Sequence, residues 1–356
     1  MSTGYSDKTS ALLKTYSPVF SAPLELTESN NYRLKTNFSN LKHVSTSDPL
    51  CLTDDSELSR ADYQKVFKIL VENRVASVLM QGGEPFLRQD ILPIIKDARR
   101  VFFTTVLTNG TLLNPEISRT LRKLNIIVVV YTPGFSEALY DSMAQEKGAY
   151  QNLVKGASSL LKVGTKPIFL IPVTKPLIPF LAETVKNIKQ LGANTIKFTV
   201  YSGAGYSQSF RNELSMSPAE ALYALYQIER LKEKYKRSMV IYHTFVAPYL
   251  ANACANAFAI DSHGNIMPCA YLRIFFGNIL RDDLGEVHKK ILSELTARVA
   301  GEGPSPGECQ NCNLRSPLTG SPCKGGCRCV AHNLYGDIAA PDRRCPYLNI
   351  NREPTN

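Results

Sequence analysis

Short apolar runs alternate with amphipathic helical segments over the first two thirds of the chain. Six runs are short, apolar and rich in β-branched residues, which predicts β-strands. They span 23–27, 76–81, 101–108, 126–132, 167–174 and 195–201. Since parallel strands need crossover connections, this alternation predicts an α/β fold with a parallel sheet. The pattern suits either an open doubly wound sheet or a partly closed barrel, and periodicity does not separate them.

Capping residues mark two of the predicted helices. Ser59 is a typical N-cap, and the apolar face that follows is spaced for a helix: Tyr63, Val66, Phe67, Leu70 and Val71. Ser217 and Glu220 form a capping box, with Pro218 at the first helical position. The stripe predicted to be buried on this second helix is Leu222, Leu225 and Ile228. No G-x-G-x-x-G follows the first strand, which disfavours a dinucleotide-binding fold.

Composition narrows the function classes. The chain has 356 residues, 44% hydrophobic and 20% charged, which is ordinary for a globular protein and excludes a wholly disordered one. No apolar stretch is long enough to cross a membrane, and the polar first 18 residues contain no secretory signal. We therefore expect a cytoplasmic protein without a membrane partner. The net charge is +10, but the densest basic patch, 229–237, mixes signs, so we expect no nucleic-acid binding.

Cysteine divides the chain into two regions. Eight of the nine cysteines lie between Cys254 and Cys345, and only Cys51 lies upstream. Glycine and proline also gather after about residue 245, and a helical pattern survives only around 284–299. This change predicts a domain boundary near 245–253. A region so poor in core-forming residues needs another source of stability, and cysteine ligation is the obvious one.

Eight cysteines make two sets of four, and three kinds of chemistry use such sets. Disulfides need an oxidising compartment, which the missing secretory signal disfavours. Zinc is held by four cysteines, often with the C-x2-C spacing of Cys309 and Cys312. Iron–sulfur clusters take four thiolates each and suit irregular, glycine-rich loops.

The cysteine region strongly resembles the SPASM domain, the auxiliary-cluster module of many radical S-adenosylmethionine (SAM) enzymes. The resemblance rests on the pattern Cys254-x9-Gly264-x4-Cys269, followed by C-x2-C, C-x3-C and a final cysteine. One departure is a ten-residue gap between Cys312 and Cys323, where five residues are usual. The resemblance implies two [4Fe–4S] clusters with interleaved ligands, as in the group that includes the pyrroloquinoline-quinone peptide cyclase. The inner cluster would use Cys254, Cys269, Cys327 and Cys329, and the outer one Cys309, Cys312, Cys323 and Cys345.

The first region resembles the radical SAM barrel. Gly82-Gly83-Glu84-Pro85 follows the second strand and is similar to that family's G-G-E-P turn, which holds the SAM amino group. Leu107-Thr108-Asn109-Gly110 resembles its turn after the third strand. The resemblance implies a partial (β/α)6 TIM-like barrel over 21–245, after an N-terminal extension of 1–20. A loop-rich SPASM domain with the two iron–sulfur clusters would then span 246–356.

The defining motif of radical SAM enzymes, C-x3-C-x2-C, is absent. Thr27 and the segment 31–33 fix the frame and place the three ligand positions at Asn30, Leu34 and Asn37; a frame one residue earlier gives Ser29, Arg33 and Thr36. Neither frame contains a cysteine, and neutral amides and an alkyl group offer iron no anionic ligand. The fourth strand also ends in Tyr131-Thr132-Pro133-Gly134, where the family often has Ser-x-Asp-Gly. We therefore expect no SAM cleavage and at most weakened SAM binding.

These expectations predict a pseudoenzyme in peptide or cofactor maturation. Its partner would be an active radical SAM enzyme, or a peptide or small-molecule substrate, with a ferredoxin or flavodoxin as redox donor. Substrate presentation and electron relay are the two roles open to it. Two alternatives remain: an active SPASM-type oxidoreductase or peptide-modifying enzyme that uses its auxiliary clusters, and a zinc-stabilised scaffold.

Overall fold

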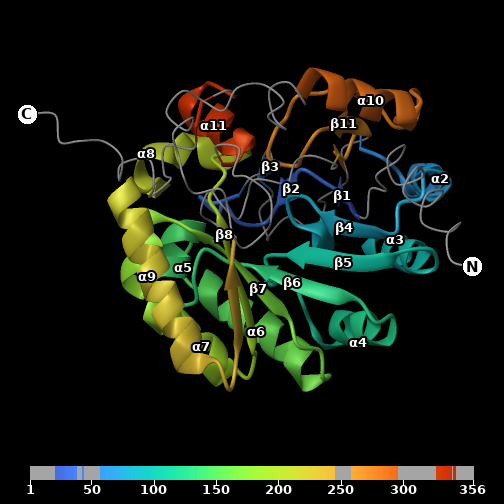
Figure 1. The fold of residues 1–356 in the computed structure, drawn as a ribbon. Coiled ribbons are helices and arrows are strands. Elements are labelled where there is room, and N and C mark those ends of the chain that lie inside the picture. The colour runs from blue at the N-terminus through green and yellow to red at the C-terminus, as the bar shows by residue number, and fades with distance from the viewer. Residues whose placement is uncertain are drawn as a thin grey trace, which may run out of the picture.

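A single ten-stranded sheet organises the molecule (Figure 1). The computed structural model describes residues 21–37, 42–43, 57–244, 258–295, 326–338 and 340–341. The strand order is β12-β11-β10-β1-β4-β5-β6-β7-β8-β9. The strands are β1 (Ser21–Glu25), β4 (Ser77–Gln81), β5 (Phe103–Thr108), β6 (Ile127–Tyr131), β7 (Ile168–Val173), β8 (Thr195–Val200), β9 (Val240–His243), β10 (Ala259–Ile260), β11 (Asn265–Met267) and β12 (Gly277–Asn278). A separate parallel pair joins β2 (Ser29–Asn30) to β3 (Lys42–His43).

Helices connect the parallel strands from β1 to β9, as parallel pairing requires. They are α2 (Arg60–Glu72), α3 (Ile91–Arg99), α4 (Pro115–Lys123), α5 (Glu137–Ala144), α6 (Ala149–Lys162), α7 (Leu181–Leu191), α8 (Arg211–Leu214) and α9 (Pro218–Tyr235). Short 3-10 helices are η1 (Pro85–Leu87), η2 (Lys175–Phe180) and η3 (Gly205–Phe210). The cysteine-rich region contributes α10 (Leu284–Leu295) and α11 (Arg328–Tyr335), which lie on the same side of the molecule in Figure 1.

The six predicted strands are confirmed as β1 and β4 to β8, and all run parallel. A seventh parallel strand, β9, was not predicted, because its four residues give too short a pattern to stand out beside a charged helix end. Within the described residues β9 and β12 do not pair, so the sheet is open and the barrel is partial. Strand β10 pairs with β1 at Leu24 and Ile260, so the sheet crosses the predicted domain boundary.

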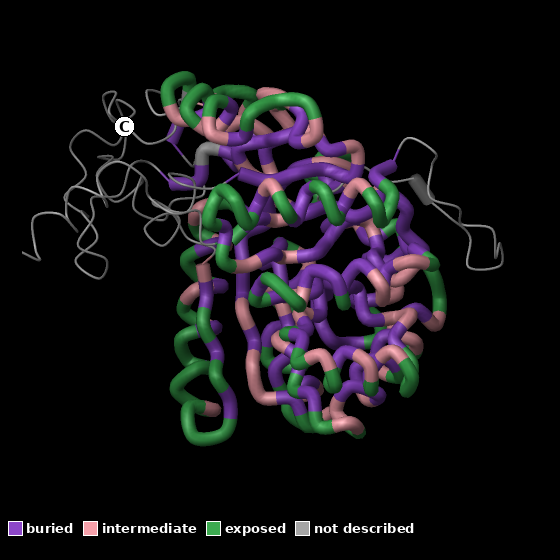
Figure 2. Tube along the Cα trace, turned by 90° about the vertical axis from the view of Figure 1, so that its right-hand side faces the viewer, coloured by how far each residue is buried: buried purple, intermediate pink, exposed green. Residues whose placement is uncertain are grey.

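The two faces of the sheet carry different side chains. Alternate residues such as Val106, Val130 and Phe198 are fully buried in the main core beneath the helices. We call the opposite side, which includes Leu107 and Tyr131, the inner face. Figure 2 shows buried positions running through the strands and exposed positions on the outer sides of the helices.

Both predicted capping residues are confirmed. Ser59 forms a full capping box with Asp62, and Ser217 forms one with Glu220. The burial predicted for Leu222 is wrong, because it is 48% exposed. The buried stripe of α9 lies on a neighbouring face instead: Ala221, Ala224, Ile228 and Leu231.

Two further helix predictions need a comment. Val71 of α2, predicted to be buried, is 47% exposed, while the other four predicted residues are buried. The helix predicted around 284–299 is present as α10, and the positions after 295 lie outside the described residues. Among the described residues, no helix has the length and apolar character that a bilayer crossing requires.

Candidate functional site

The loop after β1 contains the three positions that the sequence predicts as degenerate cluster ligands. Asn30, Leu34 and Asn37 are 1%, 1% and 5% exposed. Leu34 packs in the main hydrophobic core, and the Asn30 side-chain oxygen accepts a hydrogen bond from the Tyr32 amide at 3.0 Å. The Asn37 carbonyl accepts one from the Ser207 amide at 2.9 Å. All three positions are thus buried in the segment after β1, and none of them provides a thiolate or a carboxylate.

The predicted G-G-E-P turn lies directly against this loop. The amides of Gly83 and Glu84 donate to the carbonyls of Thr27 and Ser29 at 2.7 and 2.8 Å. A Cβ atom on Gly83 would lie 2.0 Å from the Ser29 carbonyl oxygen, a distance that real contacts do not reach. Gly82 has a φ of 143°, and its Cβ would lie 2.5 Å from the Thr27 carbonyl oxygen. Both glycines are therefore required for the close approach of two backbone segments.

Glu84 is fully buried and satisfied within the protein. Its carboxylate accepts hydrogen bonds from the Thr108 hydroxyl at 2.7 Å, the Asn109 amide at 2.7 Å and the Phe86 amide at 3.1 Å. Desolvation raises the pKa of Glu84 to about 7, although these hydrogen bonds oppose the shift. The carboxylate thereby ties the end of β4 to the end of β5.

Side-chain amides fix the middle of the loop to the turn after β5. Asn109 donates to the Asn31 side-chain oxygen at 2.8 Å, and Asn31 donates to the Thr111 hydroxyl at 2.9 Å. At the start of the loop, Glu57 accepts from the Thr27 hydroxyl at 3.1 Å and the Glu28 amide at 2.8 Å. Hydrogen bonds within the protein therefore hold the loop both at its start and at its middle.

Tyr131 closes the site from the end of β6. Its side chain is 9% exposed, and its hydroxyl donates to the Thr36 carbonyl at 2.7 Å. The tyrosine thus reaches from the end of β6 across to the loop after β1. Within the described residues, Thr36 Oγ1 and Gln81 Nε2 are buried without a hydrogen-bond partner. Glu57 Oε2, at the start of the loop, is a third buried polar atom of this kind.

The predicted inner-cluster ligands are only partly described. Cys327 and Cys329 are buried and Cys269 is half-buried, whereas Cys254, Cys309, Cys312, Cys323, Cys345 and also Cys51 lie outside the described residues. Tyr271 follows Cys269 by two residues, and its amide donates to Cys269 Sγ at 3.4 Å. Burial is the main cause that raises the pKa of Tyr271, and Tyr131 and the thiols of Cys269, Cys327 and Cys329 act on it in the same direction. The ligand sets themselves stay a prediction, because five of the eight cysteines lie outside the described residues.

The donor chemistry of this region fits an iron–sulfur cluster, because thiolates are its usual ligands. Within the described part of the chain, no three His, Cys, Asp or Glu side chains are close enough to bind a single metal ion. The loop after β1 does not fit a cluster, since its three ligand positions provide only amides and an alkyl group.

Sequence reasoning missed a buried ion pair that links the two regions. Arg273 donates to both carboxylate oxygens of Glu25 at 3.1 and 2.9 Å. Burial raises the pKa of Glu25 to about 7, although Arg273 opposes the shift. A charged residue inside the apolar run 22–26 was the available signal, but nothing local identified its partner.

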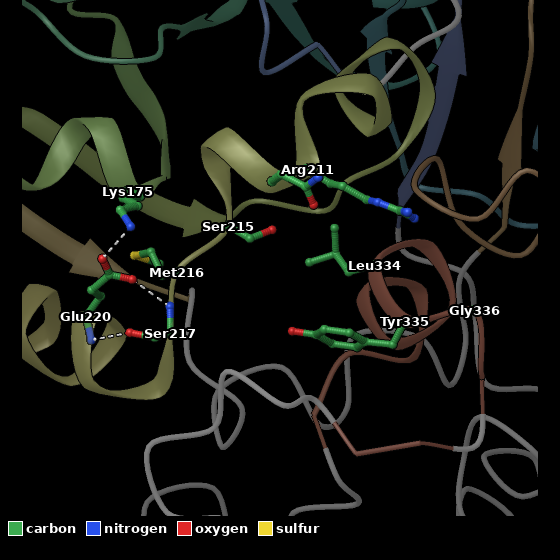
Figure 3. A pocket seen from close by; sticks show the side chains of 10 residues that line it. Lys175, Arg211, Ser215, Met216, Ser217, Glu220, Leu334, Tyr335 and Gly336 are labelled. Atoms are coloured by element: carbon green, nitrogen blue, oxygen red, sulfur yellow. Dashed lines mark hydrogen bonds and ion pairs between the residues drawn. The ribbon is translucent and has the colours of Figure 1, made fainter.

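An open cleft lies where the parallel sheet's helices meet α11 (Figure 3). Its volume is about 780 Å³, and residues of η2, α8 and the start of α9 line it opposite Leu334, Tyr335 and Gly336. Lys175 and Glu220 form an ion pair of 3.1 Å at one end, and Arg211 lies beside Leu334 at the other. None of the residues predicted to bind SAM or iron lines this cleft.

Two family models match separate parts of the chain. Residues 52–191 match the radical SAM superfamily, and residues 253–313 match the SPASM iron–sulfur cluster-binding domain. The first match implies SAM binding and the second implies an iron–sulfur cluster. The radical SAM match contains Glu84 and the turn after β5 but begins after Asn30, Leu34 and Asn37.

Related proteins cover most of the chain at low identity. An AdoMet-dependent heme synthase of Nitratidesulfovibrio vulgaris is 24% identical over 76% of this chain and 78% of its own length. A PqqA peptide cyclase of Bradyrhizobium diazoefficiens is 24% identical over 81% of this chain and 78% of its own length. The solved structure of Streptococcus suis SuiB bound to precursor peptide SuiA is similar, with a TM-score of 0.71 and 18% identity over 94% of this chain and 78% of SuiB. Native anSMEcpe with bound AdoMet has a TM-score of 0.71 and 16% identity over 91% of this chain and 93% of its own. At these identities the structural likeness shows the fold alone.

Proposed function

This chain joins a radical SAM superfamily region to a SPASM iron–sulfur region, and we propose that it is a partner protein without a SAM-cleaving cluster. One observation carries the proposal. Leu34, which stands at the middle ligand position, is 1% exposed and packs in the main hydrophobic core. An alkyl side chain there cannot bind iron. The hydrogen bonds of Thr27, Asn31 and Thr36 stabilise the loop without a metal.

Two [4Fe–4S] clusters in the cysteine-rich region complete the proposal. Cys254, Cys269, Cys327 and Cys329 would bind the inner cluster, and Cys309, Cys312, Cys323 and Cys345 the outer one. The electrostatic effect of Cys269, Cys327 and Cys329 on Tyr271, and the burial of Cys327 and Cys329, support the inner set. Reduced thiolates of this kind suit the cytoplasm, where we place the protein.

We infer that the protein presents a peptide to an active radical SAM enzyme, or relays electrons to it from a ferredoxin or flavodoxin. Peptides are the favoured substrate class, because the similar proteins include a PqqA peptide cyclase and SuiB bound to a precursor peptide. Glu84 would serve as a structural carboxylate rather than as a catalytic group, because its oxygens bond three donors within the protein.

Anaerobic purification with iron, sulfide and zinc quantification tests the proposal. We expect about eight irons per chain, since each cluster contains four. About twelve irons would restore a conventional radical SAM enzyme, and about two zinc ions without iron would indicate a zinc scaffold. The dithionite-reduced protein should convert SAM to 5′-deoxyadenosine no faster than background, and steady production would overturn the proposal.

A second experiment restores the three cysteines of the C-x3-C-x2-C motif and asks whether the protein then binds a further cluster. The triple variant Asn30→Cys, Leu34→Cys and Asn37→Cys should bind about four additional irons if thiolates are what the loop lacks. A single Leu34→Cys variant is the control, because one thiolate does not complete a three-ligand set. An unchanged iron content in a folded triple variant would show that the conformation of the loop, and not only its lack of thiolates, prevents cluster binding.

A further inference from the structure

The inner face of the sheet is covered at one end and open at the other. Toward the ends of the strands, Leu107 and Tyr131 pack with Ala259, Met267 and Ala270 of the cysteine-rich region. Toward the beginnings of the strands, large apolar side chains on the same face are exposed to solvent. Those with the largest exposed fractions are Phe103 (73%), Val240 (57%), Ile127 (51%) and Tyr242 (38%).

Strand register places these side chains on one surface. Phe103 and Leu107 lie on the same side of β5, because alternate residues of a strand share a face. Ile127 and Tyr131 share the inner side of β6 by the same rule. In the neighbouring strands Leu170 is paired with Lys197, and Lys197 is paired with Tyr242. The exposed apolar residues thus continue the covered cluster rather than forming scattered contacts.

Lys197 is the cation within this apolar surface. It is half-buried, and its Nζ lies 5.9 Å from the centre of the Tyr242 ring. Desolvation lowers the pKa of Lys197, and no described carboxylate opposes that shift or pairs with the amine. A half-buried ammonium group without an anion is unfavourable, and an anionic ligand would offset this cost.

We propose that this open inner face of β5 to β9 binds an apolar peptide segment carrying one carboxylate, which pairs with Lys197. The choice of a peptide rests on the proposed function and on the position of β9. Within the described residues β9 pairs only with β8, so one edge of this strand has backbone groups that an extended peptide could pair with. A fatty acid shares the apolar and anionic character but has no backbone to add to the sheet.

The test uses an amidated seven-residue peptide of leucine and valine with one tryptophan and one central glutamate. This protein contains no tryptophan, so the fluorescence anisotropy of the peptide reports binding directly. We expect the glutamate peptide to bind at least about ten times more tightly than the same peptide with glutamine, a difference of about 1.4 kcal/mol. Equal binding of the two peptides by the unaltered protein would overturn the proposal.

Two lysine variants localise the effect. Lys197→Met should abolish the preference for glutamate. Lys189→Met is the matched control, because Lys189 also lies over a tyrosine ring, at 5.0 Å from Tyr235, but sits on the exposed side of α7. The control should keep the full preference. If the preference survives in a folded Lys197→Met protein, the site is elsewhere and the proposal fails.

A third variant tests the apolar part of the surface. Phe103→Ser with Ile127→Ser should weaken both peptides about equally, because both side chains are already exposed and the fold does not depend on them. Unchanged affinity of both peptides for this double variant would contradict the proposal. Binding of myristate by a protein that does not bind the peptide would also contradict it. A dimer that this double variant converts to a monomer would assign the surface to a second copy of the chain instead. An iron content of about twelve would overturn the proposed function and leave the glutamate preference unaffected.

Discussion

Arg273 binds the carboxylate of Glu25 through its Nη1 atom, which lies 3.1 and 2.9 Å from the two oxygens. Glu25 ends the first strand and is 1% exposed, whereas Arg273 follows Cys269 by four residues. The same guanidinium lies 3.8 Å from Glu28 at the start of the loop. The pair therefore connects the first strand of the sheet to the segment that carries a predicted cluster ligand.

Breaking this ion pair should destabilise the protein. We expect Arg273→Gln to lower the free energy of unfolding by about 3 kcal/mol, because it leaves a buried carboxylate without its partner. Anaerobic thermal unfolding measures the loss. Lys289→Gln is the control, since its ion pair with Glu286 on α10 is exposed and should contribute less than about 1 kcal/mol. Equal effects of the two substitutions would show that the Glu25 pair does not stabilise the fold.

Stability should fall as the pH rises toward neutrality. The pKa values of Glu25 and Glu84 are raised from 4.5 to about 7, chiefly by desolvation. The folded state therefore binds these two protons more tightly than the unfolded chain. Their stabilising contribution is complete below about pH 4.5 and is lost as the pH passes 7. Each group contributes a slope of at most about 1.4 kcal/mol per pH unit.

Unfolding temperatures between about pH 5.5 and about pH 8 measure this dependence. His288 acts in the opposite direction, because burial lowers its pKa from 6.5 and stability from this group grows with pH. The variant Glu25→Gln isolates the contribution of one carboxylate. Its stability should depend less steeply on pH than that of the unaltered protein. A steeper or unchanged slope would contradict the raised pKa of Glu25.

Removing one hydroxyl group should loosen the loop after β1. Tyr131→Phe leaves the buried Thr36 carbonyl without its donor, and we expect a loss of about 1 kcal/mol in the free energy of unfolding. Hydrogen exchange of amides 32–37 should accelerate. Tyr242→Phe changes a tyrosine on the same face that is 38% exposed, and it should leave both quantities unaltered. Identical exchange in the two variants would argue that the tyrosine does not hold the loop.

The inner cluster should be separable from the outer one. Cys329→Ala removes a predicted inner ligand, so electron paramagnetic resonance of the reduced protein should lose one of two cluster signals. The iron content should fall by about four. Cys51→Ala, outside both predicted ligand sets, should leave both signals in place. Loss of neither signal, or of both while circular dichroism shows a folded protein, would refute the interleaved assignment.

The sequence by itself determined the features that depend on short spacings. Strands β1 and β4 to β8 were predicted because a buried strand is a continuous apolar run. The capping residues Ser59 and Ser217 were predicted because a cap acts within four residues. The absence of cysteine at Asn30, Leu34 and Asn37 was also evident, because it is a property of the residues themselves.

The tertiary structure decided which distant residues meet. No local pattern pairs Glu25 with Arg273, 248 residues away, or directs the Tyr131 hydroxyl to the Thr36 carbonyl. The sequence also did not show which side of α9 is exposed. Leu222 and Ala221 are only about 100° apart around the helix, and tertiary packing decides that Ala221 is the buried one. Sheet register and helix rotation fix these relationships, since they follow from how the whole chain buries its apolar surface rather than from any segment of it.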